Sequence, residues 1–128
     1  MKMRMFEIVQ TLEALKKCGN VTGLTGYAIH KNKDIFTRAA SSFLEMRDAA
    51  IKKYGEKMED GGYKIGPDAG DFHAFMSEIN PLLAIEEEVV PYQIAEPDIP
   101  YIEQLSAQEY DILESVLRKE GKDEAVTG

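Results

Sequence analysis

The chain has 128 residues, of which 44% are hydrophobic and 30% are charged, and its formal net charge is −8. A chain of this length and composition can bury a core of its own and lies outside the low-hydrophobicity range that is typical of disordered proteins. It contains no run of ~20 apolar residues that could span a bilayer, and its single cysteine, Cys18, excludes an internal disulfide and a cysteine-based zinc site.

The charge is distributed unevenly along the chain. Residues 1–55 carry ten Lys/Arg and five Asp/Glu, a net charge of +5, whereas residues 56–128 carry five and eighteen, a net charge of −13. We expect the two halves to pack together and to neutralise one another in part, within the chain or between subunits. The alternative is that the basic half presents a positively charged helical face to an acidic partner.

The first elements in chain order are a short strand and a helix. Residues 2–6 alternate in polarity, which favours a strand. Apolar residues then recur at helical spacing, as Ile8, Leu12 and Leu15, and this predicts a helix over residues 7–18.

The strongest local pattern predicts one long helix over residues 25–54. Apolar residues at helical spacing form a stripe along it, and Gly55 stands where a glycine commonly ends a helix. The stripe consists of Ala28, Ile35, Ala39, Phe43, Met46, Ala50 and Tyr54. A helix of this length extends about 45 Å at a rise of ~1.5 Å per residue, much further than the other predicted helices. We therefore expect something beyond its own short helices to cover the remainder.

A hairpin and a second short helix follow the long one. Residues 57–65 place Asp60, Gly61 and Gly62 between two short runs, and glycines of this kind adopt the backbone angles that tight hairpin turns require. Residues 71–83 carry apolar side chains at helical spacing, which predicts a helix.

The last predicted elements are an edge strand and a capped helix. Residues 88–94 have extended character, and Pro91 confines this segment to a sheet edge, where the strand at residues 2–6 is a candidate partner. Ser106 and Glu109 have the spacing of a capping box, which predicts a helix over residues 106–120.

Together these elements predict an α+β fold that is mostly helical. In this fold the long helix at 25–54 packs with helices at 7–18, 71–83 and 106–120, and a small antiparallel β element is formed from 2–6, 57–65 and 88–94. We expect a single compact domain over residues 1–120 and a flexible tail over residues 121–128.

No catalytic, cofactor or metal site is predicted. His30 and His73 lie on different predicted helices without the spacing of metal ligands. The run Glu86–Glu88 directs neighbouring carboxylates apart, and Cys18 has no identifiable base beside it. The segment Asp60–Lys64 resembles the start of a calcium loop, but Lys64 replaces an oxygen ligand. We therefore expect a protein that is not an enzyme and that binds no cofactor.

The pattern of residues along the chain resembles a known group of proteins. The resemblance rests on residues 7–15, on the Gly-Leu-Thr-Gly-Tyr-Ala-Ile start of the long helix, and on the segments at 43–48, 53–55, 78–83, 87–89 and 105–106. In these features the chain is similar to short uncharacterised proteins encoded by phages and prophages of Gram-positive bacteria. The resemblance implies a phage-related accessory, structural or assembly role, and it supplies no catalytic or ligand-binding residue. Because the sequence shows neither a membrane-spanning run nor the features of a signal peptide, we expect the protein to lie in the cytoplasm of the bacterial host.

The leading hypothesis is a non-enzymatic protein that acts through protein–protein interaction. We expect the long helix to provide the docking or self-association surface, with a second copy or another phage-encoded protein as the partner and no membrane. The candidate contact residues are Phe43, Met46, Arg47, Ala50 and Tyr54.

The alternative hypothesis is a phage-encoded regulator that binds nucleic acid through the basic face of the long helix. Six cationic residues lie on that helix, namely Lys31, Lys33, Arg38, Arg47, Lys52 and Lys53. Acidic residues are interspersed among them, and the sequence pI of about 4.8 is far from that of a dedicated nucleic-acid-binding domain. The sequence therefore favours a protein partner over nucleic acid.

Overall fold

The computed structural model describes residues 1–68 and 70–119. The helices in these ranges are α1 (Met5–Lys16), α2 (Gly23–Tyr54), α3 (Phe72–Leu83) and α4 (Ala107–Leu117). The strands are β1 (Lys2–Arg4), β2 (Glu56–Lys57), β3 (Tyr63–Lys64) and β4 (Glu86–Glu88). The predicted α+β fold, with one long helix packed against shorter helices, is confirmed. The predicted tail at 121–128 and the last residue of the predicted final helix lie outside the described residues.

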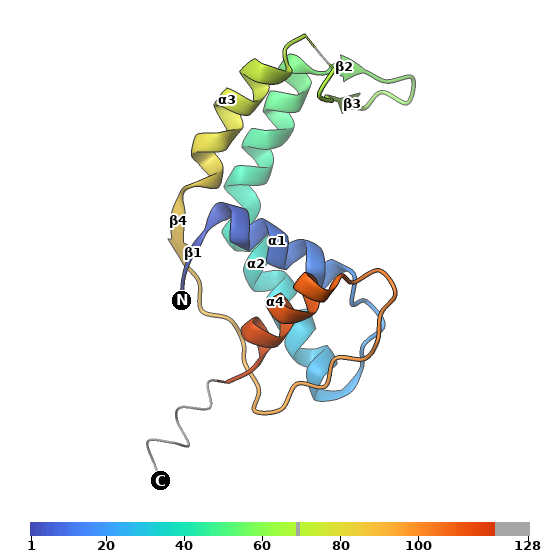
Figure 1. The fold of residues 1–128 in the computed structure, drawn as a ribbon, viewed down its shortest axis with the longest axis vertical. Coiled ribbons are helices and arrows are strands. Elements are labelled where there is room, and N and C mark those ends of the chain that lie inside the picture. The colour runs from blue at the N-terminus through green and yellow to red at the C-terminus, as the bar shows by residue number, and fades with distance from the viewer. Residues whose placement is uncertain (69, 120–128) are drawn as a thin grey trace.

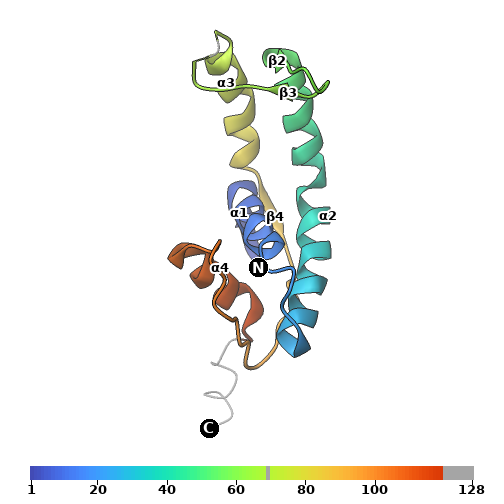
Figure 2. The same cartoon turned by 90° about the vertical axis from the view of Figure 1, so that its right-hand side faces the viewer.

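Helix α2 extends along most of the molecule, and the other elements pack along it (Figure 1). Helix α1 crosses α2 near its middle, α4 packs mainly on α1, and α3 runs beside the C-terminal half of α2 (Figure 2). The β2–β3 hairpin lies at the C-terminal end of α2 (Figure 1). Position 55 has no space for a side chain, because a Cβ atom on Gly55 would lie 2.3 Å from the Lys64 carbonyl oxygen. Helix α3 thus covers one face of a region that we expected to need an external partner.

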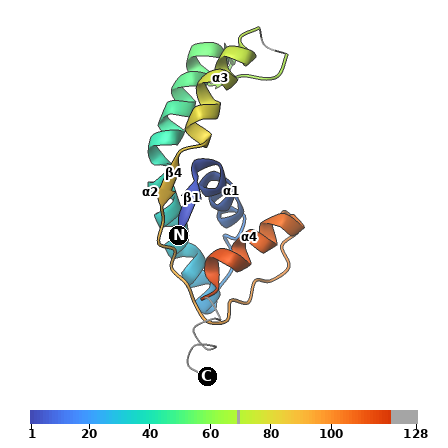
Figure 3. The same ribbon diagram turned by 60° about the vertical axis from the view of Figure 1, so that its left-hand side comes forward.

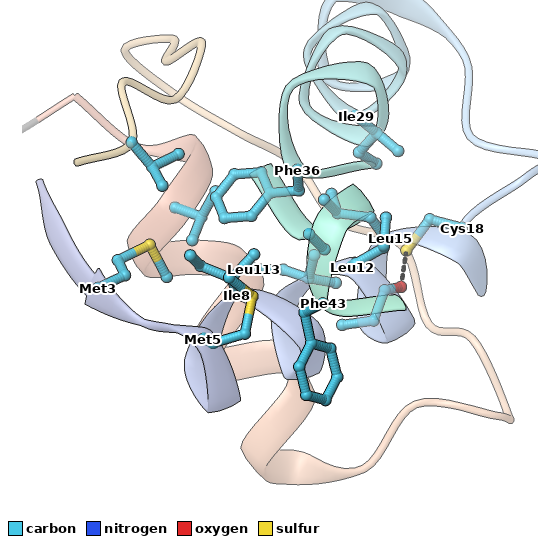
Figure 4. Close-up of a cluster of buried hydrophobic side chains, with 14 of the residues drawn as sticks. Met3, Met5, Ile8, Leu12, Leu15, Cys18, Ile29, Phe36, Phe43 and Leu113 are labelled. Atoms are coloured by element: carbon cyan, nitrogen blue, oxygen red, sulfur yellow. Dashed lines mark hydrogen bonds between the residues drawn. The ribbon is translucent and has the colours of Figure 1, made fainter. Parts of the chain in front are cut away.

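The buried face of α2 differs in part from the predicted apolar stripe. Of the predicted residues, Ala28, Phe43 and Ala50 are buried, whereas Met46 is 53% exposed. The structure adds Phe36 and the polar Asn32, both fully buried, along with Thr25, Ile29 and Ala40. Figure 4 shows Phe36 pointing into a cluster that includes Ile8 and Leu12 of α1 and Leu113 of α4. The core is therefore centred where α1 crosses α2.

A segment over residues 89–105, which we call the crossing segment, connects β4 to α4 along the N-terminal half of α2. The buried Asn32 amide holds it: Nδ2 donates to the Tyr92 carbonyl oxygen at 2.7 Å, and Oδ1 accepts from the Tyr92 backbone N–H at 2.9 Å. Further along, Thr25 Oγ1 accepts from the Asp98 backbone N–H at 2.8 Å. Two polar side chains of α2 thereby satisfy backbone groups that a neighbouring strand would otherwise bond.

The strand predicted at 88–94 lies earlier in the chain than expected. Strand β1 pairs with β4 at Glu86–Glu88 in antiparallel register, and in the described part of the chain after β4 only Ile94 forms a further bridge, to Arg118. The Val89 N–H still donates to the Met1 carbonyl oxygen at 2.9 Å, but Pro91 lacks a backbone donor and Asn32 engages the backbone of Tyr92, so the segment after Val89 leaves the ladder. The prediction that the N-terminal strand is the partner of this segment was correct.

Among the residues that the structure describes, three ion pairs join the basic N-terminal half to the acidic C-terminal half. The Met1 ammonium lies 2.7 Å from Glu88, Lys17 lies 2.7 Å from Glu109, and Lys53 lies 3.4 Å from Glu78. These contacts agree with the expectation that the two halves pack together and partly neutralise one another. Their solvent exposure limits what each contributes to stability.

The pair between Lys17 and Glu109 makes stability depend on pH. The hydrogen bond from Lys17, followed by the one from the Ser106 backbone, lowers the pKa of Glu109. A carboxyl whose folded-state pKa is lowered stabilises the protein above its unfolded-state pKa, and this contribution is lost as the pH falls through the folded-state value. We expect Glu109→Gln, which keeps an acceptor for the Ser106 N–H, to cost about 0.2–1 kcal/mol at pH 7.

Thermal unfolding at pH 7 and at pH 2.5 measures this contribution. The deficit of Glu109→Gln should be present at pH 7 and smaller at pH 2.5, because the contribution of the charge is lost as the pH falls through the lowered folded-state pKa of Glu109. An equal deficit at both pH values would assign it to the cap of α4 and not to the charge of Glu109. Glu103→Gln, at an exposed position, is the matched control.

Candidate interaction surface

The five residues predicted as a contact surface differ in their solvent exposure. Phe43 and Ala50 belong to the buried core, and Tyr54 is half-buried with its hydroxyl donating to Glu78 at 3.0 Å. Arg47 is half-buried, and its Nε has no hydrogen-bond partner among the described residues. Met46 alone of the five is well exposed. The structure therefore assigns Phe43 and Ala50 to internal packing and leaves Met46 available for contact.

Met46 lines an apolar groove of about 280 Å³ between α2, the end of α3 and β4, which we call the α2–β4 groove. Its apolar lining consists of Met5, Ala39, Phe43, Met46, Leu82 and Ile85. Arg38, Ser42 and Glu87 supply its polar groups. Met46 and Ile85 are both large hydrophobic residues that remain exposed, so the groove presents apolar surface to solvent. Figures 2 and 3 both show β4 beside the middle of α2.

Only some of the backbone N–H and C=O groups of β4 form hydrogen bonds with β1. The pairs Met1/Val89 and Met5/Ile85 are joined by backbone hydrogen bonds of 2.9 and 2.7 Å. Hydrogen-bonded and non-hydrogen-bonded pairs alternate along an antiparallel ladder, so Met3 and Glu87 form the hydrogen-bonded pair within the strands. The backbone N–H and C=O groups of Glu86 and Glu88 consequently point away from β1. In the part of the chain that the structure describes, no hydrogen bond satisfies them, so this edge of β4 is open.

The electrostatics of this edge are acidic. Glu86, Glu87 and Glu88 are all exposed. The hydrogen bond from the Met1 ammonium lowers the pKa of Glu88. Arg38, the cation of the groove, is paired with Asp34 at 2.6 Å, so its charge is largely compensated. The α2–β4 groove therefore combines apolar lining and open backbone groups with the negative charge of Glu86 and Glu87, whereas the charge of Glu88 is partly compensated by the Met1 ammonium.

A second groove of about 500 Å³ lies between β1, α1 and α4. Phe6 and Ile112 line it from facing helices, but polar side chains alternate with apolar ones around it. The polar lining includes Glu7, Gln10, Gln108, Asp111 and Ser115. It is larger than the α2–β4 groove, yet nothing in it selects one class of ligand, so substitutions there serve as controls for the α2–β4 groove.

Four of the six cations of α2 lie beside a partner side chain among the described residues, whereas Lys31 and Lys33 do not. Arg38 pairs with Asp34, Arg47 lies 3.6 Å from Asp48, and Lys53 pairs with Glu78. Lys52 lies over the ring of Tyr63, 5.8 Å from its centroid. The carboxylates beside these cations lower the positive potential that a phosphate backbone would meet.

The other residues considered from the sequence do not assemble into a site. No group of three or more His, Cys, Asp or Glu side chains within residues 1–68 and 70–119 is placed to hold a metal ion. Asp60 accepts a hydrogen bond from the Gly62 N–H at 2.9 Å, which is a turn contact of the β2–β3 hairpin. None of the helices in the described ranges is long and apolar enough to cross a lipid bilayer.

Cys18 lies in the core at the end of α1, where its thiol contacts the Ala14 carbonyl oxygen at 3.4 Å. Burial raises the pKa of this thiol above its ordinary value, which lowers the thiolate fraction at neutral pH. We expect its reaction with an aromatic disulfide reagent at pH 8 to be about 100-fold or more slower in the native chain than in 6 M guanidinium chloride, because the reaction needs local opening. Comparable rates in both states would show that Cys18 is accessible and contradict its burial.

Comparisons with protein-family models, curated proteins and solved structures found no match. The resemblance to phage and prophage proteins therefore stays a prediction from the sequence.

The sequence predicted that α2 provides the interaction surface, but it did not predict most of the residues that line the α2–β4 groove. Ile85, Leu82 and the open edge of β4 come from the second half of the chain, and their position beside Met46 depends on how α3 returns along α2. The available signal was the mismatch between three consecutive glutamates and the apolar residues on either side of them. Such a sequence is typical of a strand edge protected by charge.

Proposed function

We propose that this protein is a non-enzymatic interaction module that docks a partner protein in the α2–β4 groove. The observation that carries the proposal is the groove itself, where the half-exposed Met46 and Ile85 flank an apolar lining next to an open strand edge. Exposed apolar surface beside polar groups marks interaction sites on soluble proteins. The partner is a second copy of the chain or another protein.

The sequence resemblance gives this proposal its biological setting. It implies an accessory, structural or assembly role for a phage or prophage protein, and we propose that this role is carried out in the cytoplasm of the bacterial host. Docking of one protein on another is the activity that such a role requires, and it needs neither a cofactor nor a catalytic group.

Paired charge substitutions test the proposal. Met46→Glu places a carboxylate in the α2–β4 groove, whereas Phe6→Glu places one at a similarly exposed position in the second groove, between β1, α1 and α4. Light scattering measures self-association, and quantitative co-purification from the native cell measures binding to other proteins. We expect Met46→Glu to reduce whichever association the wild type forms at least about tenfold, and Phe6→Glu to leave it unchanged. A wild-type chain that stays monomeric and retains no partner, or equal losses in both variants, would rule the proposal out.

Nucleic-acid binding through α2 is the alternative proposal, and the ion pairs of Arg38, Arg47 and Lys53 count against it. It predicts retention of DNA or RNA that weakens steeply with added salt. Titration of the protein with DNA and with RNA at 20 mM salt, comparing the wild type with Lys31→Glu, distinguishes the two proposals. Salt-sensitive binding that Lys31→Glu abolishes would favour this alternative over docking of a protein.

A further inference from the structure

We propose that the α2–β4 groove binds an extended, basic segment of a partner protein by adding it as a third strand at the open edge of β4. This inference rests on the proposed function and specifies how the groove recognises its partner. It combines three independent features of the same place: the unused backbone groups of β4, the apolar groove beside them and the charge of the strand.

The backbone of β4 supplies the hydrogen bonds for such a strand. The N–H and C=O groups of Glu86 and Glu88 point away from β1, as the register of the β1–β4 pair requires. An added strand would lie ~4.8 Å from β4 and pair with these groups. An extended peptide bound at a sheet edge gains its affinity from main-chain hydrogen bonds and its specificity from pockets for alternate side chains.

Side chains alternate across the β1–β4 pair in a way that provides such a pocket. Met3 and Val89 are buried, so the face that carries Ile85, Glu87 and Val89 is the one turned toward the core and α2. The α2–β4 groove opens on this face, where Ile85 and Glu87 line it together with Ala39 and Met46 of α2. Every second side chain of an added strand would therefore enter the groove, and an aliphatic side chain matches its apolar lining.

The negative charge of β4 favours basic side chains at the outward-facing positions of the added strand. Glu86 and Glu88 lie on the outer face, opposite Arg4 and Lys2 of β1 respectively. Residues directly opposite one another on neighbouring strands interact favourably when their charges are opposite and unfavourably when they are alike. Lysine or arginine at alternate positions of the added strand would repeat on the free side of β4 the pairing that β1 makes on the other.

A second copy of this chain is a poorer occupant than a separate basic segment. Pairing β4 with β4 of another copy would set glutamates against glutamates, a like-charge arrangement that protects strand edges from self-association. The open edge of β1 is basic, but the Arg4 backbone N–H already donates to Glu7 at 2.9 Å, and α1 begins at the next residue. This leaves Lys2 as the one backbone donor of β1 on that edge.

Selection from a random heptapeptide library on the full-length protein, with counter-selection on Met46→Glu, tests the proposal. We expect the retained peptides to alternate Lys/Arg with aliphatic residues. N-methylation of every second peptide nitrogen should weaken binding at least about tenfold, because it removes main-chain donors. Glu86→Lys should weaken it by a similar factor and should not change the unfolding midpoint by more than a few degrees, since Glu86 is exposed.

Amide hydrogen exchange identifies the binding mode. At saturating peptide, the amides of Glu86 and Glu88 should exchange at least about tenfold more slowly, whereas the Glu87 amide, already bonded to Met3, should change little. Groove-dependent peptides that are acidic, tolerate N-methylation or leave these two amides unchanged would overturn strand addition while leaving the groove as a docking site. A library that yields no groove-dependent peptide would overturn strand addition, and an intact partner complex of Met46→Glu would then overturn the proposed function as well.

Discussion

Phe36→Ala is expected to lower the free energy of unfolding by about 3–5 kcal/mol, because it removes a fully buried aromatic ring and leaves a cavity at the crossing of α1 and α2. Domains of this size are stable by only about 5–15 kcal/mol, so the loss is a large part of the total. Urea unfolding followed by circular dichroism measures it.

Phe6→Ala is the matched control for this substitution. Phe6→Ala makes the same chemical change on α1, but the Phe6 side chain is 49% exposed. We therefore expect the free energy of unfolding to fall by less than about 1 kcal/mol. Equal losses in the two variants would contradict the position of the core.

Asn32→Ala is expected to cost about 2–4 kcal/mol, since it leaves the Tyr92 backbone N–H and C=O without their partner and removes the bond to the Ala28 carbonyl oxygen. The loss should be accompanied by faster proteolysis within the crossing segment, because Asn32 holds this segment on α2. Urea unfolding and limited proteolysis with mapping of the first cleavage site measure the two effects.

Asn80→Ala provides the comparison, because Asn80 also lies within a helix but is exposed. We expect it to be neutral or slightly stabilising, as alanine has the higher helix propensity. First cleavage of Asn32→Ala outside residues 89–105, or no loss of stability, would mean that Asn32 does not hold the crossing segment.

The helices could be predicted from the sequence because their signals are local. Helical spacing predicted α2 to within two residues at its start, and the capping box at Ser106 and Glu109 is present as predicted, with the Glu109 N–H donating to Ser106 Oγ at 3.1 Å. The buried face of α2 was predicted less well. Asn32 lies on it as a polar residue whose partner, Tyr92, is 60 positions away, and a hydrophobicity pattern carries no information about such a contact.

The candidate site could be predicted only in part for the same reason. Met46 was identified from its place on α2, but the pattern placed it in the same stripe as Phe43, and α3 and α1 decide which of them is buried. The run Glu86–Glu88 was predicted to direct its neighbouring carboxylates apart and to form no catalytic site, and all three residues are exposed. Its pairing with β1 and its position beside the groove follow from the tertiary fold.

Photo-crosslinking from inside the groove tests the central claim most directly. A benzophenone amino acid at position 46 is compared with the same group at position 6, since Met46 and Phe6 are exposed to a similar extent, 53% and 49%, in different grooves. Irradiation of the cells that make the protein, followed by mass spectrometry, identifies the adducts. We expect position 46 to yield one dominant protein adduct, at a basic extended segment, and position 6 to yield none. Adducts of equal yield from both positions, or an adduct from position 6 alone, would contradict the assignment of the α2–β4 groove as the docking site.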